Sequence, residues 1–229
     1  MDNTIQQLLP IMFNMQHELN QRVHPEWWKQ NYSWRRAIDQ ELSELVDHVG
    51  WKWWKQQEPD LEQIELELVD VWHFALSLMA EYPLEHVGNE PKQLDEAFTE
   101  MSGQLAEYWD APMDSAETTW TDYIDAIKID ALSQNSFNVT AFRHLLDHFG
   151  MSFKTLYAKY VGKNILNEFR QANGYKEGTY LKTWDKGLED NEVLTKILKE
   201  TFNPNLIAKR LMEEYSRVRQ AKAIASKFS

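Results

Sequence analysis

The chain has 229 residues and no cysteine, which excludes disulfide bonds, thiolate metal sites and a cysteine nucleophile. Its net charge of −12 argues against general nucleic-acid binding, because that affinity comes from neutralising backbone phosphates. We find no apolar stretch long enough to span a membrane and no basic segment followed by an apolar run near Met1, so we expect a cytoplasmic protein that binds neither nucleic acid nor membrane.

Charge is distributed unevenly along the chain. Residues 1–150 hold 27 acidic and 9 basic residues, a net charge of −18, whereas residues 151–229 hold 9 acidic and 15 basic residues, a net charge of +6. The acidic part suits cation binding, and the basic part suits phosphate binding. With only 8 Gly and 7 Pro, and no alternation of polar and apolar residues of useful length, the composition favours long helices over strands.

We predict an all-α fold, a helical bundle built from one domain over residues 1–229. Apolar residues at helical spacing predict helices over residues 4–22, 34–49, 61–81, 119–134, 140–149, 152–172, 192–200 and 204–225. Residues 83–118 are polar and weakly periodic, so we predict a variable, loop-rich insertion with one short helix. That insertion would separate two parts of a helical core, residues 1–82 and 119–225.

Local signals indicate where several helices begin and end. Ser33 and Asp60 are good N-cap residues, and Gln63 stands at the capping-box position after Asp60. Gly50 should interrupt the second helix. Pro83 should end the third helix, because the residue before a proline is disfavoured in helical conformation and proline lacks a backbone N–H.

Two of the predicted helices carry the same pattern, a pair of acids three residues apart. Glu41 and Glu44 form the first pair, and Glu67 and Asp70 form the second. Residues at i and i+3 lie on one face of a helix, so two such helices packed together would gather four carboxylates. A cluster of this kind needs a cation, and hard oxygen ligands favour Mg²⁺, with Mn²⁺ next. We therefore predict a metal site on two central helices that serves chemistry on a phosphate.

The third helix favours metal binding over the ordinary explanation of such acids. Pairs of acids are common on solvated helix faces, but the helix predicted at 61–81 is apolar on nearly all sides, and such a helix is buried. Burying Glu67 and Asp70 without partners would cost several kcal/mol for each charge. A bound metal avoids that cost. His73 on the same helix is better interpreted as a core histidine than as a ligand.

A basic cluster is predicted near the end of the helix at 152–172. Lys163, Asn167 and Arg170 fall on one face at i, i+4 and i+7, and Lys176 can fold back from the following loop. Arginine binds phosphate oxygens in pairs, and lysine acts as a point charge. A solvated basic helix end would show the same pattern, but together with an acidic metal site these residues favour binding of a polyphosphate.

Aromatic and amide side chains could hold a base. The chain has 10 Trp, 9 Tyr and 10 Phe, and core packing would use most of them. Trp51 and Phe74 lie within one or two helical turns of an acidic pair and are candidates for stacking on a base. Gln16 and Asn20, at i and i+4, could bind the edge of a base through paired donors and acceptors.

The order of these motifs resembles that of the dimeric dUTPases, a family of all-α nucleoside triphosphate pyrophosphohydrolases. The resemblance is carried by the two acidic pairs, by WKWWK at 51–55, by GKNILNEFRQANGYKEGTYLKTW at 162–184 and by EDN at 189–191. It covers residues 16–191, and 162–184 is its most specific part.

The resemblance implies an all-helical homodimer that hydrolyses dUTP to dUMP and pyrophosphate with two or three Mg²⁺ ions, and dUDP is a further candidate substrate. The four acids of the two pairs would bind metal. The residues implied to contact phosphate or sugar are Lys163, Asn167, Arg170, Lys176, Tyr180, Lys182 and Asn191. The residues implied to surround the uracil are Gln16, Asn20, Trp51 and Phe74.

The reaction we expect is in-line attack of a metal-activated water on the α-phosphate, with pyrophosphate as the leaving group. Glu41 or Glu44 would also accept the proton of the water. Lys163, Arg170 and Lys176 would offset the charge that builds on the phosphates. Such an enzyme keeps uracil out of DNA and supplies dUMP.

Three other interpretations stay open from the sequence. A related pyrophosphohydrolase acting on dCTP or on several nucleotides would share the metal chemistry and differ in the base pocket. A di-iron carboxylate bundle needs a Glu-x-x-His pair on each of two helices, and only Asp70 with His73 approaches that pattern. A non-enzymatic helical interaction protein would have exposed acids, and Mg²⁺ would not raise its melting temperature.

Overall fold

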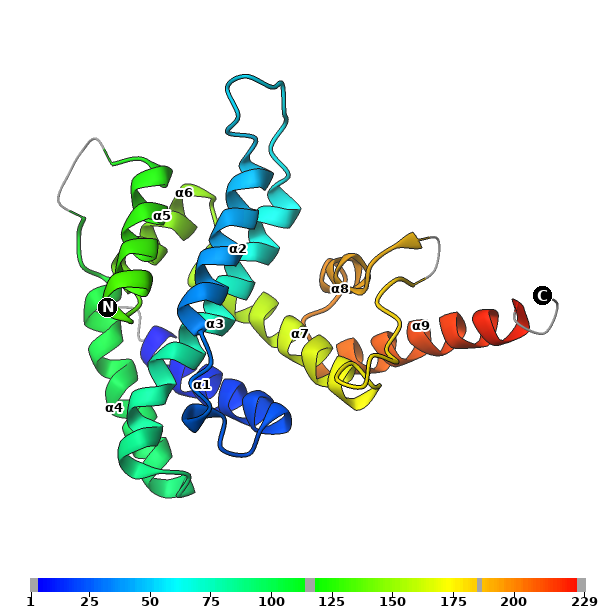
Figure 1. Ribbon diagram of the computed structural model, residues 1–229, viewed down its shortest axis with the longest axis horizontal. Coiled ribbons are helices and arrows are strands. Elements are labelled where there is room, and N and C mark those ends of the chain that lie inside the picture. The colour runs from blue at the N-terminus through cyan, green and yellow to red at the C-terminus, as the bar shows by residue number, and fades with distance from the viewer. Residues whose placement is uncertain (1–3, 114–117, 185–186, 226–229) are drawn as a thin grey trace. The chain divides into compact units, whose positions relative to one another are not determined.

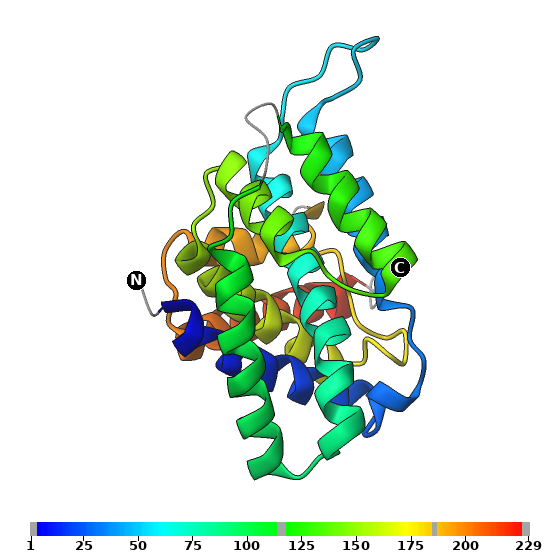
Figure 2. The same cartoon turned by 90° about the vertical axis from the view of Figure 1, so that its left-hand side faces the viewer.

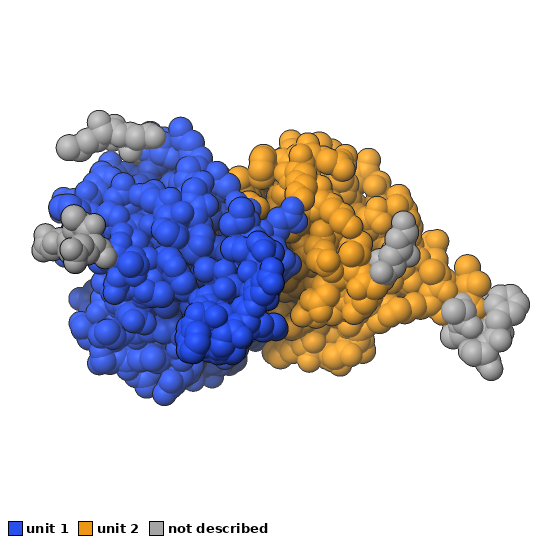
Figure 3. All heavy atoms as spheres, turned by 90° about the horizontal axis from the view of Figure 1, so that it is seen from above, with its two compact units in different colours: residues 1–157 blue, residues 158–229 orange. Residues whose placement is uncertain are grey.

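The computed structural model describes residues 4–113, 118–184 and 187–225. The chain forms two compact units, residues 1–157 and 158–229 (Figure 3). The expected all-α class is confirmed, because the regular elements among the described residues are helices, and β-type pairing there is limited to an isolated bridge between Thr183 and Glu189. The expectation of a single domain stays a prediction.

The first unit is a bundle built around one long buried helix. Its elements are α1 (Thr4–Val23), the 3₁₀ turn η1 (Trp27–Lys29), α2 (Trp34–Val49), α3 (Leu61–Val87), α4 (Pro91–Trp109), α5 (Trp120–Ile129), the π turn η2 (Asp130–Gln134), α6 (Val139–His148) and the first turn of α7 (Phe153–Ala172). Helices α2 and α3 run side by side (Figure 1). Helix α1 packs on α3 and α4, and α5 packs on α6 (Figure 2).

Helix α3 supplies much of the core of this unit. Its fully buried side chains include Ile64, Leu68, Val69, Val71, Trp72, Ala75 and Leu76. Trp72 stacks on Phe142 of α6 with ring centroids 5.1 Å apart. A helix that is buried on most sides cannot offer its polar residues to bulk water, so the environment of each polar group on α3 has to be explained by the protein.

Most of the predicted helix ends are confirmed. Gly50 caps α2 in the left-handed conformation, with φ of 73°, which glycine adopts without steric cost. Asp60 caps α3 by accepting a hydrogen bond from the backbone N–H of Gln63 at 3.2 Å. Ser33 occupies the N-cap position of α2, but its side chain makes no capping hydrogen bond.

Two predictions in the middle of the chain were wrong. Helix α3 continues through Pro83 and ends at Val87, because Pro83 and Leu84 are buried and their packing outweighs one missing N–H bond. The segment at 83–118, expected to be rich in loops with one short helix, contains the 19-residue helix α4. Its buried face carries Leu94, Phe98, Ser102 and Trp109, a stripe too sparse to stand out from the polar residues between them.

The second unit consists of the rest of α7 with α8 (Asp190–Leu198) and α9 (Pro204–Ala225). Its core gathers Leu166, Phe169, Trp184, Leu194, Ile207, Leu211 and Tyr215. A Cβ atom at Gly162 would lie 2.8 Å from Leu198 Cδ2, so a larger residue would force the Leu198 side chain to move where α7 meets the end of α8. No helix among the described residues is long and apolar enough to cross a membrane.

Candidate functional site

Helices α2 and α3 bring three of the four predicted acids together. One carboxylate oxygen each from Glu41, Glu67 and Asp70 lies within 4.8 Å of the others. Glu67 is buried, and Glu41 and Asp70 are half-buried. Glu44 lies outside this group, is exposed, and accepts a hydrogen bond from Gln40 Nε2 at 2.9 Å. We call Glu41, Glu67 and Asp70 the acid cluster.

The acid cluster is electrostatically strained without a cation. Burial, a hydrogen bond to Glu41 and the charges of Asp70, Glu41 and Glu44, with burial the largest cause, together raise the pKa of Glu67 from 4.5 to about 8. His48 of α2 lies 3.7 Å from the Glu67 carboxylate. In the absence of a metal ion, the Glu67 carboxyl therefore tends to keep its proton, because burial and the neighbouring carboxylates disfavour its charge.

The donor set of the acid cluster fits a hard divalent cation. All three side chains offer carboxylate oxygen, which Mg²⁺ and Mn²⁺ prefer, and they offer no soft ligand. His73, the residue nearest to the histidine of a di-iron bundle, is not part of this group, and its Nδ1 lies 2.7 Å from Gln16 Oε1. Magnesium or manganese is consequently the better match to these residues.

A buried polar network lies between α1 and α3 and contains both predicted base-binding amides. Gln16 Nε2 donates to Asn20 Oδ1 at 3.1 Å, and both amides donate to Ser77 Oγ, at 3.1 and 2.9 Å. Gln16, Asn20, His73 and Ser77 are all buried, and we call them the amide network. Ser77 was missed from the sequence, although it follows Asp70 by seven residues and so shares its face of the helix.

The two aromatic candidates lie in different surroundings. Phe74 is half-buried on α3, and its ring lies 6.2 Å from that of Trp34. Trp51 is 44% exposed and contacts Trp54 in the loop at 50–60, which extends beyond the ends of α2 and α3 (Figures 1 and 2). Phe74 lies about 20 Å along α3 from the helix end that adjoins this loop. Phe74 is therefore better placed than Trp51 to stack on a base bound at the amide network.

One face of α3 connects the acid cluster to the amide network. Glu67, Asp70, Phe74 and Ser77 follow one another at steps of three and four residues, which places them on a single stripe of the helix. The rise of an α-helix puts Ser77 about 10 Å from Asp70 along the axis. A ligand lying along this stripe could reach carboxylates at one end and amides at the other.

The second unit contains a buried ion pair that the sequence did not reveal. Arg170 donates from Nε and Nη2 to the two carboxylate oxygens of Asp190, at 2.7 and 2.8 Å, and Tyr180 donates to the same carboxylate at 2.8 Å. Burial raises the pKa of Asp190, but the hydrogen bonds and charge of Arg170 outweigh it and hold the pKa below its ordinary value. Burial and the Asp190 charge raise the pKa of the Tyr180 hydroxyl. Asp190 therefore orients two of the predicted phosphate-binding residues.

Other predicted residues of the second unit join this pair. Asn191 Oδ1 accepts from Lys163 Nζ and from Arg170 Nη2, each at 3.1 Å, and Asn167 accepts from Arg170 Nη1 at 3.0 Å. The structure thus brings five of the seven residues into one network. Lys182 instead pairs with Glu189 at 3.0 Å, and Lys176 is exposed.

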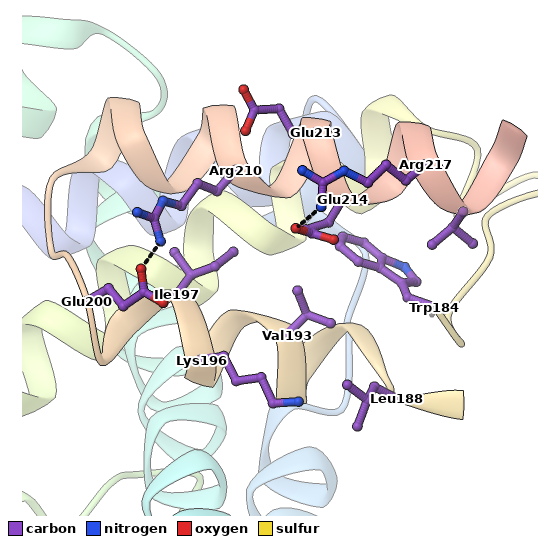
Figure 4. A pocket seen from close by; sticks show the side chains of 11 residues that line it. Trp184, Leu188, Val193, Lys196, Ile197, Glu200, Arg210, Glu213, Glu214 and Arg217 are labelled. Carbon is purple, nitrogen blue, oxygen red and sulfur yellow. Dashed lines mark hydrogen bonds and ion pairs between the residues drawn. The ribbon is translucent and has the colours of Figure 1, made fainter. Parts of the chain in front are cut away.

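A groove of about 480 Å³ lies between α8 and α9 (Figure 4). Its apolar lining consists of Trp184, Leu188, Val193, Ile197 and Val218. Its rim carries ion pairs between Arg210 and Glu200 and between Arg217 and Glu214. Because these charges are already paired and the groove contains none of the predicted site residues, we assign no nucleotide to it.

Comparison with models of protein families relates the chain to a known family. The model described as dUTPase matches residues 8–175, nearly three quarters of the chain. The matched segment includes the acid cluster, the amide network and Arg170, and it ends before Lys176, Tyr180, Lys182 and Asn191. A search of curated proteins finds no match.

Proposed function

The chain belongs to the dUTPase family, and we propose that it hydrolyses dUTP to dUMP and pyrophosphate as a Mg²⁺-dependent homodimer. The observation that carries this proposal is the acid cluster on α2 and α3, where three carboxylates stand within 4.8 Å of one another and burial disfavours the charge of Glu67. An enzyme that handles a triphosphate needs a divalent cation, and these residues are suited to hold one.

The proposed roles in the first unit follow from burial and position. Glu41, Glu67 and Asp70 would hold Mg²⁺, and the bound ion would activate water and stabilise charge on the phosphate. Glu44 is the fourth metal-binding candidate. Glu41 and Glu44 are the candidates for accepting the proton of the attacking water, and the exposed carboxylate of Glu44 is open to solvent for that purpose.

The proposed roles in the second unit follow from charge. Arg170, Lys163 and Lys176 would neutralise phosphate oxygens, with Arg170 oriented by Asp190. The remaining candidates for contacts to phosphate or sugar are Asn167, Tyr180, Lys182 and Asn191. Gln16 and Asn20 would bind the uracil edge, Phe74 would stack on the ring, and Trp51 is a further candidate for stacking.

The test is a panel of dUTP, dCTP, dTTP and dATP with detection of pyrophosphate, run with Mg²⁺, with Mn²⁺ and with a chelator. We expect pyrophosphate and dUMP from dUTP, loss of activity with the chelator and recovery with either metal. Preference for dCTP, or equal use of all four, would replace the proposed substrate. Orthophosphate as the product would refute attack at the α-phosphate, and light scattering on a sizing column would test the dimer.

A further inference from the structure

The amide network has a feature that the family match does not assign, namely a serine that fixes which way the two amides face. Ser77 Oγ donates its single hydrogen to the backbone carbonyl of His73, one turn earlier, at 3.0 Å. Its two lone pairs then accept from Gln16 Nε2 and Asn20 Nδ2. A hydroxyl has one donor and two acceptor positions, so all of its hydrogen-bonding capacity is used.

The rest of the network follows from that arrangement. Gln16 directs both hydrogens of its amide nitrogen to Ser77 and Asn20. Its oxygen therefore faces His73 Nδ1, which must carry the proton. Asn20 uses one N–H toward Ser77 and one lone pair toward Gln16. Its amide retains one N–H and one lone pair for a ligand.

Without the serine, the hydrogen bonds among the other three side chains could also form in the opposite orientation. Rotating both amides by half a turn would let Asn20 donate to Gln16 and Gln16 donate to His73 Nδ1, with the imidazole proton moved to Nε2. In this reversed network Gln16, Asn20 and His73 Nδ1 still form hydrogen bonds with one another. With Ser77 present it would place two amide oxygens against the serine oxygen, and the hydroxyl hydrogen could relieve only one of those contacts.

The orientation matters because uracil and cytosine present opposite edges. At neighbouring ring positions uracil offers a carbonyl acceptor and an N–H donor, whereas cytosine offers an amino donor and a ring-nitrogen acceptor. An amide with its N–H and oxygen fixed in one order matches the first edge, and it opposes donor to donor and acceptor to acceptor on the second. A half-turn of the Asn20 amide would exchange these preferences.

We propose that Ser77 is the positioning residue that sets base preference, because it holds Asn20 and Gln16 in the orientation that accepts uracil and rejects cytosine. This inference rests on the proposed function and adds the origin of its specificity. Ser77 itself is fully buried and acts through the two amides. The stripe on α3 places it at the opposite end from the acid cluster, so its effect should be on the choice of base and not on metal binding.

The test compares kcat/KM for dUTP and for dCTP in the wild-type protein and in Ser77→Ala. We expect the ratio of the two values to fall by about ten- to a hundredfold, chiefly through a higher KM for dUTP. Ser77→Thr keeps a hydroxyl that can bond the carbonyl one turn back and should retain most of the ratio. The matched control is Ser102→Ala on α4, because Ser102 is equally buried and makes the same bond to the carbonyl of Phe98, at 2.7 Å.

The outcomes separate this inference from the proposed function. If Ser77→Ala lowers turnover of both nucleotides in equal proportion, or keeps the wild-type ratio, Ser77 has no role in specificity. A wild-type protein that releases no pyrophosphate from dUTP would refute the proposed function instead. Nitrogen-15 NMR of His73 then still tests the network, since we expect the proton on Nδ1 in the wild type and a mixture of tautomers in Ser77→Ala. The proton on Nε2 in the wild type would overturn the arrangement.

Discussion

Replacing Asp190 by asparagine should destabilise the second unit strongly. The Asp190 side chain is fully buried and that of Arg170 is 11% exposed, and the carboxylate accepts hydrogen bonds from Arg170, Tyr180 and the backbone N–H of Asn191. Asp190→Asn keeps the shape but leaves the guanidinium buried without a counter-charge. Losing one partner of a buried ion pair costs about 3–5 kcal/mol, a large part of the total stability of about 5–15 kcal/mol that is typical of a protein.

The assay is urea unfolding followed by circular dichroism, with hydrogen exchange to localise the loss to residues 158–229. Lys182→Gln is the control, because the pair of Lys182 with Glu189 is about half exposed and should contribute under about 1 kcal/mol. Adding Arg170→Met to Asp190→Asn should recover part of the loss, since it removes the unpaired charge. A loss below about 1 kcal/mol, or strict additivity in the double variant, would refute the reasoning.

The pH dependence of this pair has a defined sign. The folded-state pKa of Asp190 is lowered from its ordinary value of 3.8, so the unfolded chain binds a proton more readily than the folded one. The contribution to stability is therefore complete above pH 3.8 and is lost as the pH falls through the lowered pKa. Asp190→Asn should accordingly flatten the acid limb of a stability profile.

Three further predictions concern the proposed site. With metal removed, the raised pKa of Glu67 means that the free energy of unfolding should fall as the pH rises from 4.5 to about 8; Glu67→Gln should remove that slope in chelator, and an unchanged profile would contradict it. Asp70→Asn and Glu44→Gln should each abolish dUTP turnover while circular dichroism stays unchanged, and near-normal turnover in either would remove that residue from the site. Arg170→Lys keeps a charge beside Asp190 but loses the bidentate fork, so KM for dUTP should rise and kcat should fall, and unchanged kinetics would exclude a phosphate contact.

Local signals predicted the parts of the fold whose causes are local. The αL conformation at Gly50 and the Asp60 cap depend on residues within one turn, and such effects can be read from sequence. Pro83 misled the prediction because a proline inside a helix costs one hydrogen bond, which the burial of its neighbours outweighs. Only packing decides between those two effects, and packing is not local.

The same distinction applies to the site. The meeting of Glu67 and Asp70 was predictable because spacing along a helix fixes which side chains share a face, whereas the same spacing did not bring Glu44 into the acid cluster. The role of Asp190 was not predictable, because its partner Arg170 lies 20 residues earlier and spacing along the chain does not show that the two side chains meet. Ser77 was missed for another reason: a serine within an apolar helix is unremarkable until the amides that it contacts are placed by α1.

The stripe on α3 explains why this helix combines an apolar circumference with a few buried polar groups. A buried polar group is costly without a partner. Ser77 has the two amides as partners, and the proposed cation would be the partner of the buried Glu67 and the half-buried Asp70. Because a helix is stiff, these partners are held at a fixed separation of about 10 Å. In the proposed function, α3 fixes the distance between the reacting phosphate and the recognised base. A nucleotide with the wrong base could not move along α3 to find other contacts without moving its phosphate away from the metal.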